Sequence, residues 1–181
     1  MNIFISMLRG INVSGRKNIQ MEELRGLYKS LNLVDVETYV QSGNVVFNTT
    51  EQDTSKLACI LEATLEEAFG YDVRVFIRAT EDFQRIIESN PYLNERNEDP
   101  AKLYVTFLYS PPSESRLGNF SRPDEEIAEF VVGEREIYLF CLNGYGRTRL
   151  SNSFFEKKLD IPATTRNWNT VNALYSIAHA R

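Results

Sequence analysis

The stretch Val36-Glu-Thr-Tyr-Val-Gln-Ser-Gly-Asn-Val-Val-Phe47 decides how the first half of this chain folds. Its two ends, 36–40 and 45–47, are short and rich in β-branched and aromatic residues, which are the residue types that strands prefer. Between them, Gln41-Ser-Gly-Asn44 has the composition of a turn, with glycine and asparagine available for a positive φ. The stretch therefore predicts a β-hairpin.

On either side of this hairpin, the sequence predicts one helix and one strand. Short apolar runs bounded by turn residues are typical of buried strands, and apolar residues at helical spacing are typical of helices that cover a sheet. The resulting order β-α-β-β-α-β is that of a ferredoxin-like unit, which we expect to occupy residues 1–79. Asn18 is a suitable N-cap for the first helix, and Gly70 is a suitable stop for the second. The flanking elements are a strand over 3–8, a helix over 20–31, a helix over 56–69 and a strand over 73–77.

The second half, 80–181, is predicted to contain β-α-β-β-α with further helices at both ends. Ser153, followed by Glu156, has the pattern of a capping box, and Thr164 or Thr165 can cap the last helix. We expect residues 80–181 to form a second α/β half with C-terminal helices. The predicted elements are a helix over 80–89, a strand over 103–109, a short helix over 113–118, a hairpin over 127–132 and 136–142, and two C-terminal helices.

Several strands are apolar at both odd and even positions, as in Ile3-Phe-Ile-Ser-Met-Leu8 and Ile137-Tyr-Leu-Phe-Cys-Leu142. Successive residues of a strand point to opposite faces, so both faces of each sheet should be covered. Helices can cover one face, and the sheet of the other half most simply covers the second. We therefore expect an α+β fold in which two ferredoxin-like halves pack sheet to sheet, with additional C-terminal helices.

Charge and composition narrow the classes of function. The 181 residues carry a net charge of −5, so the chain as a whole is not attracted to nucleic acid or to an anionic membrane. The N-terminus has no basic region of the kind that opens a signal peptide, which predicts a cytoplasmic protein. Cys59 and Cys141 are expected to be buried thiols, and the single histidine, His179, is poorly placed for catalysis. No spacing of residues predicts a metal or another cofactor.

The loop Gly10-Ile-Asn-Val-Ser-Gly15-Arg-Lys17 is similar in spacing to a phosphate-binding loop. The lysine and hydroxyl that should follow the second glycine are replaced by Arg16 and Lys17, so we exclude a nucleotidase of that type. Together with Arg9, these cations can still hold some anion. The alternative is an ordinary connection between a strand and a helix, whose glycines adopt a positive φ and whose cations are solvated.

Three further segments combine polar groups that suit either a ligand or a simple structural role. Residues 41–44 can present amides and a hydroxyl, but they are also good turn formers. The loop 144–149 places two arginines between a strand and a helix, which suits an anion or an exposed loop. In 163–170, polar residues surround a tryptophan at the start of a helix. Either this tryptophan simply packs in the core, or Arg166 and Asn167 lie at the rim of a site.

Three segments carry a resemblance to a known family. They are Leu8-Arg-Gly-Ile-Asn-Val-Ser-Gly15, Thr38-Tyr-Val-Gln-Ser-Gly-Asn-Val-Val-Phe47 and Ala163-Thr-Thr-Arg-Asn-Trp-Asn-Thr-Val171. With the stretch 144–156, they make the chain resemble the bacterial domain-of-unknown-function family catalogued as 1697, apart from Ser14, where that family often has glycine. The resemblance implies two intertwined ferredoxin-like halves and no established activity. Because the four polar loops coincide with these segments, it also points to a shared site.

Three functions are compatible with these patterns. The first is the binding of a small anionic metabolite, by a binding protein or an enzyme whose catalytic residues the sequence does not nominate. The second is nucleic-acid binding, against which the negative charge and the covered sheets both weigh. The third is a structural or interaction module whose polar segments only shape turns and caps. The residues assigned to the anion are Arg9, Asn12, Lys17, Gln41, Ser42, Asn44, Arg149, Arg166 and Asn167.

Overall fold

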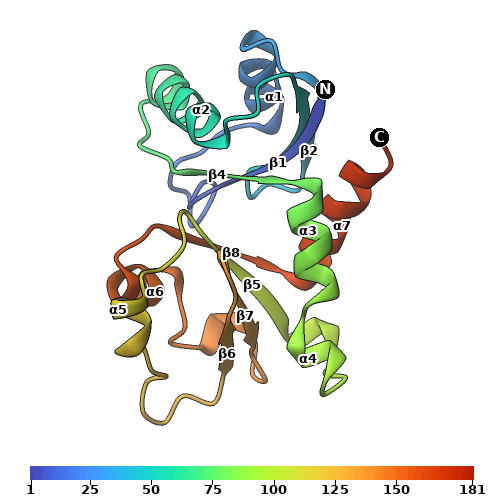
Figure 1. Cartoon of the computed structure of the whole chain (residues 1–181). Coiled ribbons are helices and arrows are strands. Elements are labelled where there is room, and N and C mark those ends of the chain that lie inside the picture. The colour runs from blue at the N-terminus through green and yellow to red at the C-terminus, as the bar shows by residue number, and fades with distance from the viewer. The chain divides into compact units, whose positions relative to one another are not determined.

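The computed structural model describes residues 1–181, and the chain divides into two compact units. Unit 1 comprises residues 1–84 together with 173–181, and unit 2 comprises residues 85–172. Each unit contains one four-stranded antiparallel sheet with two helices on one of its faces (Figure 1). The C-terminal residues of the chain thus belong to the same unit as the N-terminal half.

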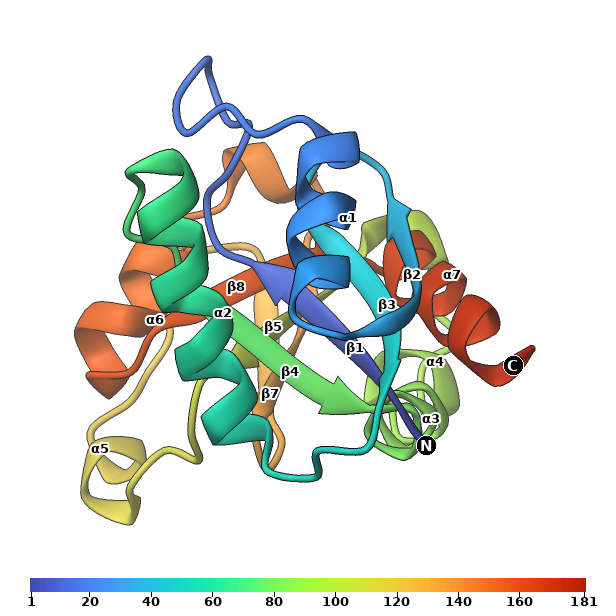
Figure 2. The same ribbon diagram turned by 90° about the horizontal axis from the view of Figure 1, so that it is seen from above.

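Unit 1 has the predicted order β-α-β-β-α-β. Its sheet has the strand order β2-β3-β1-β4, and β1 pairs antiparallel with both of its neighbours. Helices α1 and α2 lie side by side over one face of the sheet (Figure 2). This confirms the ferredoxin-like unit predicted from the hairpin at 36–47. The elements are β1 (Asn2–Leu8), α1 (Met21–Ser30), β2 (Val34–Tyr39), β3 (Asn44–Thr49), α2 (Thr54–Phe69) and β4 (Val75–Ala79).

Both faces of this sheet are buried, as the apolar pattern predicts. Ser6 pairs with Val45 and Ile77 across the strands, and all three share the face that the helices cover. On that face the Ser6 hydroxyl lies 2.9 Å from the hydroxyl of Tyr28 in α1. Burial raises the pKa of Tyr28, and the bond to Ser6 offsets this only in part. On the opposite face, Ile5 is also fully buried.

The two predicted helix signals of unit 1 have different outcomes. Gly70 ends α2 in the left-handed conformation with a φ of 71°, as predicted. Asn18 does not cap α1, so that prediction is wrong. The helix begins after Gln20, whose backbone N–H donates to the Glu23 carboxylate at 3.4 Å. Asn18 instead donates to the carbonyl of Gly15 at 3.2 Å, because it still belongs to the loop that precedes the helix.

Unit 2 repeats the order of unit 1 in full. Its sheet has the strand order β6-β7-β5-β8, which matches the order in unit 1 position by position. Helices α5 and α6 lie on one face, where Leu108, Leu139 and Phe155 belong to one buried cluster. The elements are β5 (Leu103–Leu108), α5 (Glu114–Gly118), β6 (Glu129–Val132), β7 (Glu136–Phe140), α6 (Asn152–Leu159) and β8 (Ala163–Asn167).

Strand β8 is the one strand that the sequence did not predict. Thr164 and Thr165, which were expected to cap the last helix, lie in β8 and pair with β5, so that expectation is wrong. Threonine is common in strands, but it is polar, so an edge strand rich in threonine does not form the apolar run from which strands are predicted. The last helix, α7 (Trp168–His179), is capped by Asn167, whose side-chain oxygen accepts from the Thr170 N–H at 2.8 Å.

The capping box predicted at Ser153 is also wrong. Helix α6 is capped by Ser151, whose hydroxyl accepts from the Phe154 N–H at 3.2 Å, and Ser153 lies inside the helix. The Glu156 carboxylate accepts from the N–H of Ala163 at 3.0 Å, and thereby ties α6 to the start of β8.

The remaining helices include one that was predicted and three short ones that were not. In both units the last strand of the sheet leads directly into a helix. Helix α3 (Thr80–Glu88) follows β4, and α7 follows β8. Both of these helices cross from one unit to the other. None of the helices combines the length and hydropathy that a bilayer crossing requires. The short helices are α4 (Pro91–Asn94), η1 (Pro100–Lys102) and η2 (Tyr145–Arg147).

The two cysteines differ in exposure. Cys141 is buried as predicted, and burial raises the pKa of its thiol to about 12. Cys59 lies exposed on α2, so the expectation of a buried thiol is wrong there. The helix turns Leu57, Ala58 and Leu61 toward the core, which leaves Cys59 on its outer side.

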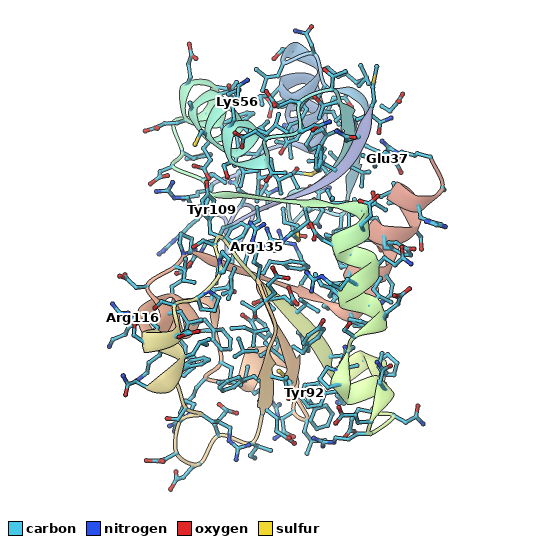
Figure 3. All side chains as sticks on the ribbon, in the orientation of Figure 1. Glu37, Lys56, Tyr92, Tyr109, Arg116 and Arg135 are labelled. Atoms are coloured by element: carbon cyan, nitrogen blue, oxygen red, sulfur yellow. The ribbon has the colours of Figure 1, made fainter.

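The last residue of the chain is anchored to unit 1. The guanidinium of Arg181 donates to the carbonyl of Asp35, and it lies 3.1 Å from the carboxylate of Glu37. Glu37 lies in β2 and is labelled in Figure 3. The Arg181 side chain is only 16% exposed. The C-terminal segment is therefore held by specific bonds to this edge strand.

Candidate functional site

The first polar loop forms a small β-hairpin between β1 and α1. Two backbone hydrogen bonds of 3.0 and 3.1 Å link residues 12–13 to residues 16–17. At the tip, Ser14 has a φ of 51° and Gly15 a φ of 72°, and two successive left-handed residues are typical of a type I′ turn. Figure 2 shows this hairpin reaching out beyond the end of α1. Gly15 therefore serves a tight turn.

Asn12 ties this hairpin to the turn between β2 and β3. Its side-chain amide donates to the carbonyl of Ile19 at 2.9 Å and to the carbonyl of Gln41 at 2.7 Å, and its side-chain oxygen accepts from the N–H of Ile19 at 2.9 Å. The amide is thus fully used within the loops. We call the surface built from Arg9–Lys17 and Val40–Asn44 the loop pair.

Gly43 brings the two parts of the loop pair into close contact. Its carbonyl accepts from the N–H of Leu8 at 2.8 Å, and its φ is 75°. A Cβ at this position would lie 2.7 Å from Cδ1 of Ile11, which leaves no room for a side chain. The neighbouring Asn44 is fully buried and donates to the carbonyl of Tyr39 at 3.1 Å and to the hydroxyl of Ser42 at 2.9 Å.

The backbone of the loop pair is strained at several residues that carry side chains. Val40 is the clearest case, because it is β-branched, has a φ of 52° and is 49% exposed. Such conformations cost about 1–3 kcal/mol each and persist only where the surroundings impose them. The residues with a left-handed backbone are Gly10, Asn12, Ser14, Gly15, Lys17, Val40 and Gly43.

The surface of the loop pair carries cationic and amide side chains beside two exposed valines, Val13 and Val40. Arg16 and Gln41 are exposed, and neither side chain makes a hydrogen bond or an ion pair. The ammonium of Lys17 donates to the carbonyl of Asp72, and Arg9 is half-buried. The structure thus brings the predicted residues of unit 1 together, with Asn12 and Asn44 shaping the loops.

In unit 2, Arg166 is buried in β8. It is 8% exposed, and its guanidinium donates to the hydroxyl of Thr164 at 2.8 Å and to the carbonyl of Thr165 at 3.0 Å. Desolvation lowers the pKa of Arg166 to about 10, against a smaller opposing effect of Tyr145. The group therefore remains a cation at neutral pH. Unit 1 carries a matching buried arginine, since Arg78 occupies the same place in β4.

The three residues predicted in unit 2 do not line one cavity. Arg149 is exposed, and its backbone N–H donates to Glu126 at 2.7 Å. It lines a cavity of about 210 Å³ that neither Arg166 nor Asn167 reaches. Asn167 caps α7 with its side-chain oxygen.

Sequence reasoning missed a partly buried polar network that joins two of the polar segments. The hydroxyl of Tyr145 donates to that of Thr165 at 3.2 Å, which itself donates to the side-chain oxygen of Asn152 at 2.6 Å. The hydroxyl of Thr106 lies 2.8 Å from Thr165 as well, and the ring of Tyr145 stacks on Tyr104 with centroids 5.2 Å apart. The only signal was that Tyr145 and Thr165 both lie in segments already singled out for their polar groups.

No group of three or more histidine, cysteine, aspartate or glutamate side chains is placed to hold a metal ion. The single histidine, His179, stacks on Tyr175 near the end of α7. The guanidinium and amide side chains of the loop pair can bind charged and hydrogen-bonding groups.

Comparison with known proteins shows which family the chain belongs to. A family model described as "Protein of unknown function (DUF1697)" matches residues 1–138. The chain belongs to this family. The match to DUF1697 includes the whole loop pair, and the family's description assigns no function. The third segment of the resemblance, 163–171, lies beyond the matched residues.

A solved structure shares the fold of this DUF1697 member. It is the conserved bacterial protein SP0830 from Streptococcus pneumoniae, with a TM-score of 0.73 and 22% sequence identity over 98% of each chain. At this level of identity the likeness shows the fold, and it confirms the α+β class. A search of curated proteins found no match.

Proposed function

We propose that the loop pair of unit 1 binds a small anionic ligand, in a protein of the cytoplasm. The observation that carries this proposal is the exposed guanidinium of Arg16, which has no partner and stands on a hairpin that Asn12 fixes to the turn at Gln41. A rigid loop presents its charged groups without a further loss of conformational entropy when a ligand binds.

The strain in the loop pair supports the same proposal. Val40, Ser14 and Lys17 adopt a backbone conformation that glycine or asparagine would adopt at lower cost. Strained backbone of this kind is concentrated at ligand sites, where the surrounding structure imposes it. The exposed side of Val40 gains no packing that would offset its strain.

We assign the contacts to Arg9, Arg16, Lys17, Gln41 and Ser42. Asn12 and Asn44 hold the loops in shape, while Arg149, Arg166 and Asn167 stay predictions as contacts. A small anion fits better than nucleic acid, because the net charge of −5 repels a polyanion and leaves only local cations to attract a ligand.

Calorimetric titration with inorganic phosphate and with malonate at low ionic strength tests this proposal. Arg16→Gln should weaken binding by about 10–100-fold, since a hydrogen bond to a charged group contributes roughly 1.5–3 kcal/mol. The control is Lys29→Gln, which removes the same charge from an exposed position on α1 of the same unit and should leave the affinity unchanged. If neither anion binds, or if both variants weaken binding equally, the loop pair is not an anion site.

A further inference from the structure

The cavity that Arg149 lines is in unit 2, at the open end of the β6–β7 hairpin. It has a volume of about 210 Å³ and is lined by 125–128 before β6, by 141–144 after β7, and by 147–149. We call it the β6–β7 cavity. Its volume is below the range of about 300–1,000 Å³ that is usual for drug-sized ligands, so it suits a small metabolite.

One carboxylate of this cavity is committed to the backbone. Glu126 accepts from the N–H of Arg149 at 2.7 Å and from the N–H of Ala128 at 2.8 Å. Burial acts to raise the pKa of Glu126, but these bonds and one from Thr148 outweigh it, so that the pKa is lowered. Glu126 is therefore ionised, and it fixes the two walls of the cavity to each other.

Two side chains of opposite charge in the same lining have no bonding partner in the protein. Arg147 and Glu125 are both exposed, and neither side chain makes a hydrogen bond or an ion pair, even with the other. The guanidinium of Arg149 makes a single long bond of 3.4 Å to the carbonyl of Asp124. The cavity thus offers guanidinium groups for a carboxylate and a separate carboxylate for a cation.

Two apolar side chains of the lining are exposed. Ile127 is 59% exposed and Leu142 is 50% exposed. Ile127 precedes β6 and Leu142 follows β7, so both lie at the same end of the hairpin. Covering them would remove apolar surface from water, which favours a ligand that carries an apolar group.

The backbone of Glu125 gives a further indication. Its φ is 61°, a conformation that asparagine or glycine adopts more readily than glutamate. The side chain forms no hydrogen bond or ion pair within the protein that would explain its presence at a left-handed position. A role for the carboxylate toward a ligand explains why this position tolerates the strain.

We infer that the β6–β7 cavity binds a free α-amino acid with an apolar side chain. Arg147 and Arg149 receive its carboxylate, Glu125 receives its ammonium group, and Ile127 and Leu142 cover its side chain. A ligand that has only one of these three groups, the carboxylate, the ammonium group or the apolar side chain, leaves a charged group or the apolar walls of the cavity without a complement. This site is independent of the loop pair in unit 1.

Calorimetric titration of the full chain with L-leucine tests the inference. Isocaproate lacks the ammonium group of leucine, isoamylamine lacks the carboxylate, and free glycine lacks the apolar side chain. We expect leucine to bind at least about tenfold more tightly than each of these three compounds, because each loses one complementary contact.

Variants assign the contacts. Arg147→Gln should weaken the binding of leucine and isocaproate about tenfold or more, and Glu125→Asn should weaken the binding of leucine and isoamylamine to a similar extent. Glu125→Asn relieves the left-handed strain, so the variant should melt no lower than the parent chain, which separates lost binding from lost folding. The control is Arg122→Gln, an exposed arginine close in sequence that does not line the cavity.

Three outcomes overturn the inference. They are the absence of leucine binding at low ionic strength, equal affinities for leucine and its three analogues, and equal effects of Arg147→Gln and Arg122→Gln. Arg16→Gln in the loop pair should leave leucine binding unchanged, so failure of the anion proposal in unit 1 is distinguishable from failure here.

Discussion

Replacing Glu136 by glutamine should lower the free energy of unfolding of unit 2. The Glu136 side chain is 2% exposed, beside the turn of the β6–β7 hairpin. Its carboxylate accepts from the guanidinium of Arg85 at 2.8 and 3.4 Å, and from the backbone N–H groups of Arg135 at 3.1 Å and Glu134 at 3.4 Å. Glutamine retains one acceptor oxygen, but it turns an NH₂ group toward the donors that faced the other oxygen.

The size of the effect follows from exposure. Removing one partner of a buried ion pair costs about 3–5 kcal/mol. The Arg85 side chain is 38% exposed, so water stabilises the charge that remains. The expected loss therefore falls to about 2–3 kcal/mol. In a chain of this length, such a loss corresponds to a melting temperature that is lower by roughly 4–12 °C.

Urea denaturation followed by circular dichroism measures this loss, and Glu129→Gln is a matched control. Glu129 lies on the neighbouring strand β6 and pairs with Arg96 at 2.8 Å, but its side chain is 39% exposed. Exposed pairs contribute about 0–1 kcal/mol, so the control should change stability little. Equal losses in the two variants would refute the reasoning, because burial would then not be the factor that makes the Glu136 contacts strong.

Three further predictions concern single positions. Gly43→Ala should lower the melting temperature measured by calorimetry, because it combines a φ of 75° with a Cβ contact of 2.7 Å, whereas Gly26→Ala in the open interior of α1 should raise stability by about 0.5–1 kcal/mol. Val40→Asn should raise the urea midpoint, since asparagine tolerates the left-handed backbone; a lower midpoint would show that Val40 packs usefully. Because the pKa of Glu126 is lowered in the folded protein, its ionised carboxylate stabilises the fold at any pH above the pKa of an unfolded glutamate, about 4.3. This stabilisation is lost as the pH falls through the pKa of Glu126 in the folded protein. Acid titrations monitored by fluorescence should therefore show a smaller loss of stability for Glu126→Gln than for the parent chain.

The fold was predictable wherever the sequence pattern is local. The hairpin at 36–47 and the glycine at the end of α2 depend on neighbouring residues, and both were found from the sequence. Strand β8 was missed because Thr164 and Thr165 form a strand only by pairing with β5. That pairing depends on the fold of the whole of unit 2, not on the neighbouring residues. Asn18 and Ser153 show that a suitable residue type fixes a helix start only within a few positions.

The candidate site was predictable in composition but not in role. Asn12 was assigned to a ligand because it is a polar residue in a glycine-containing loop, yet its amide is used by bonds that include Gln41, 29 residues away. No local pattern reveals such a bond. Glu125 drew no attention in the sequence and Ile127 was assigned only to a strand, because their relation to Arg147 exists only once β6 and β7 have paired and brought the two segments together.

The bond between Arg181 and Glu37 has a consequence for how this chain folds. The two residues are 144 positions apart, whereas unit 2 is built from one continuous segment. Contacts between residues far apart in sequence slow folding, because a long loop must close before they form. During synthesis, unit 2 has its full sequence before the segment 173–181 has been made. The half of the protein that is synthesised first is therefore the last to be completed.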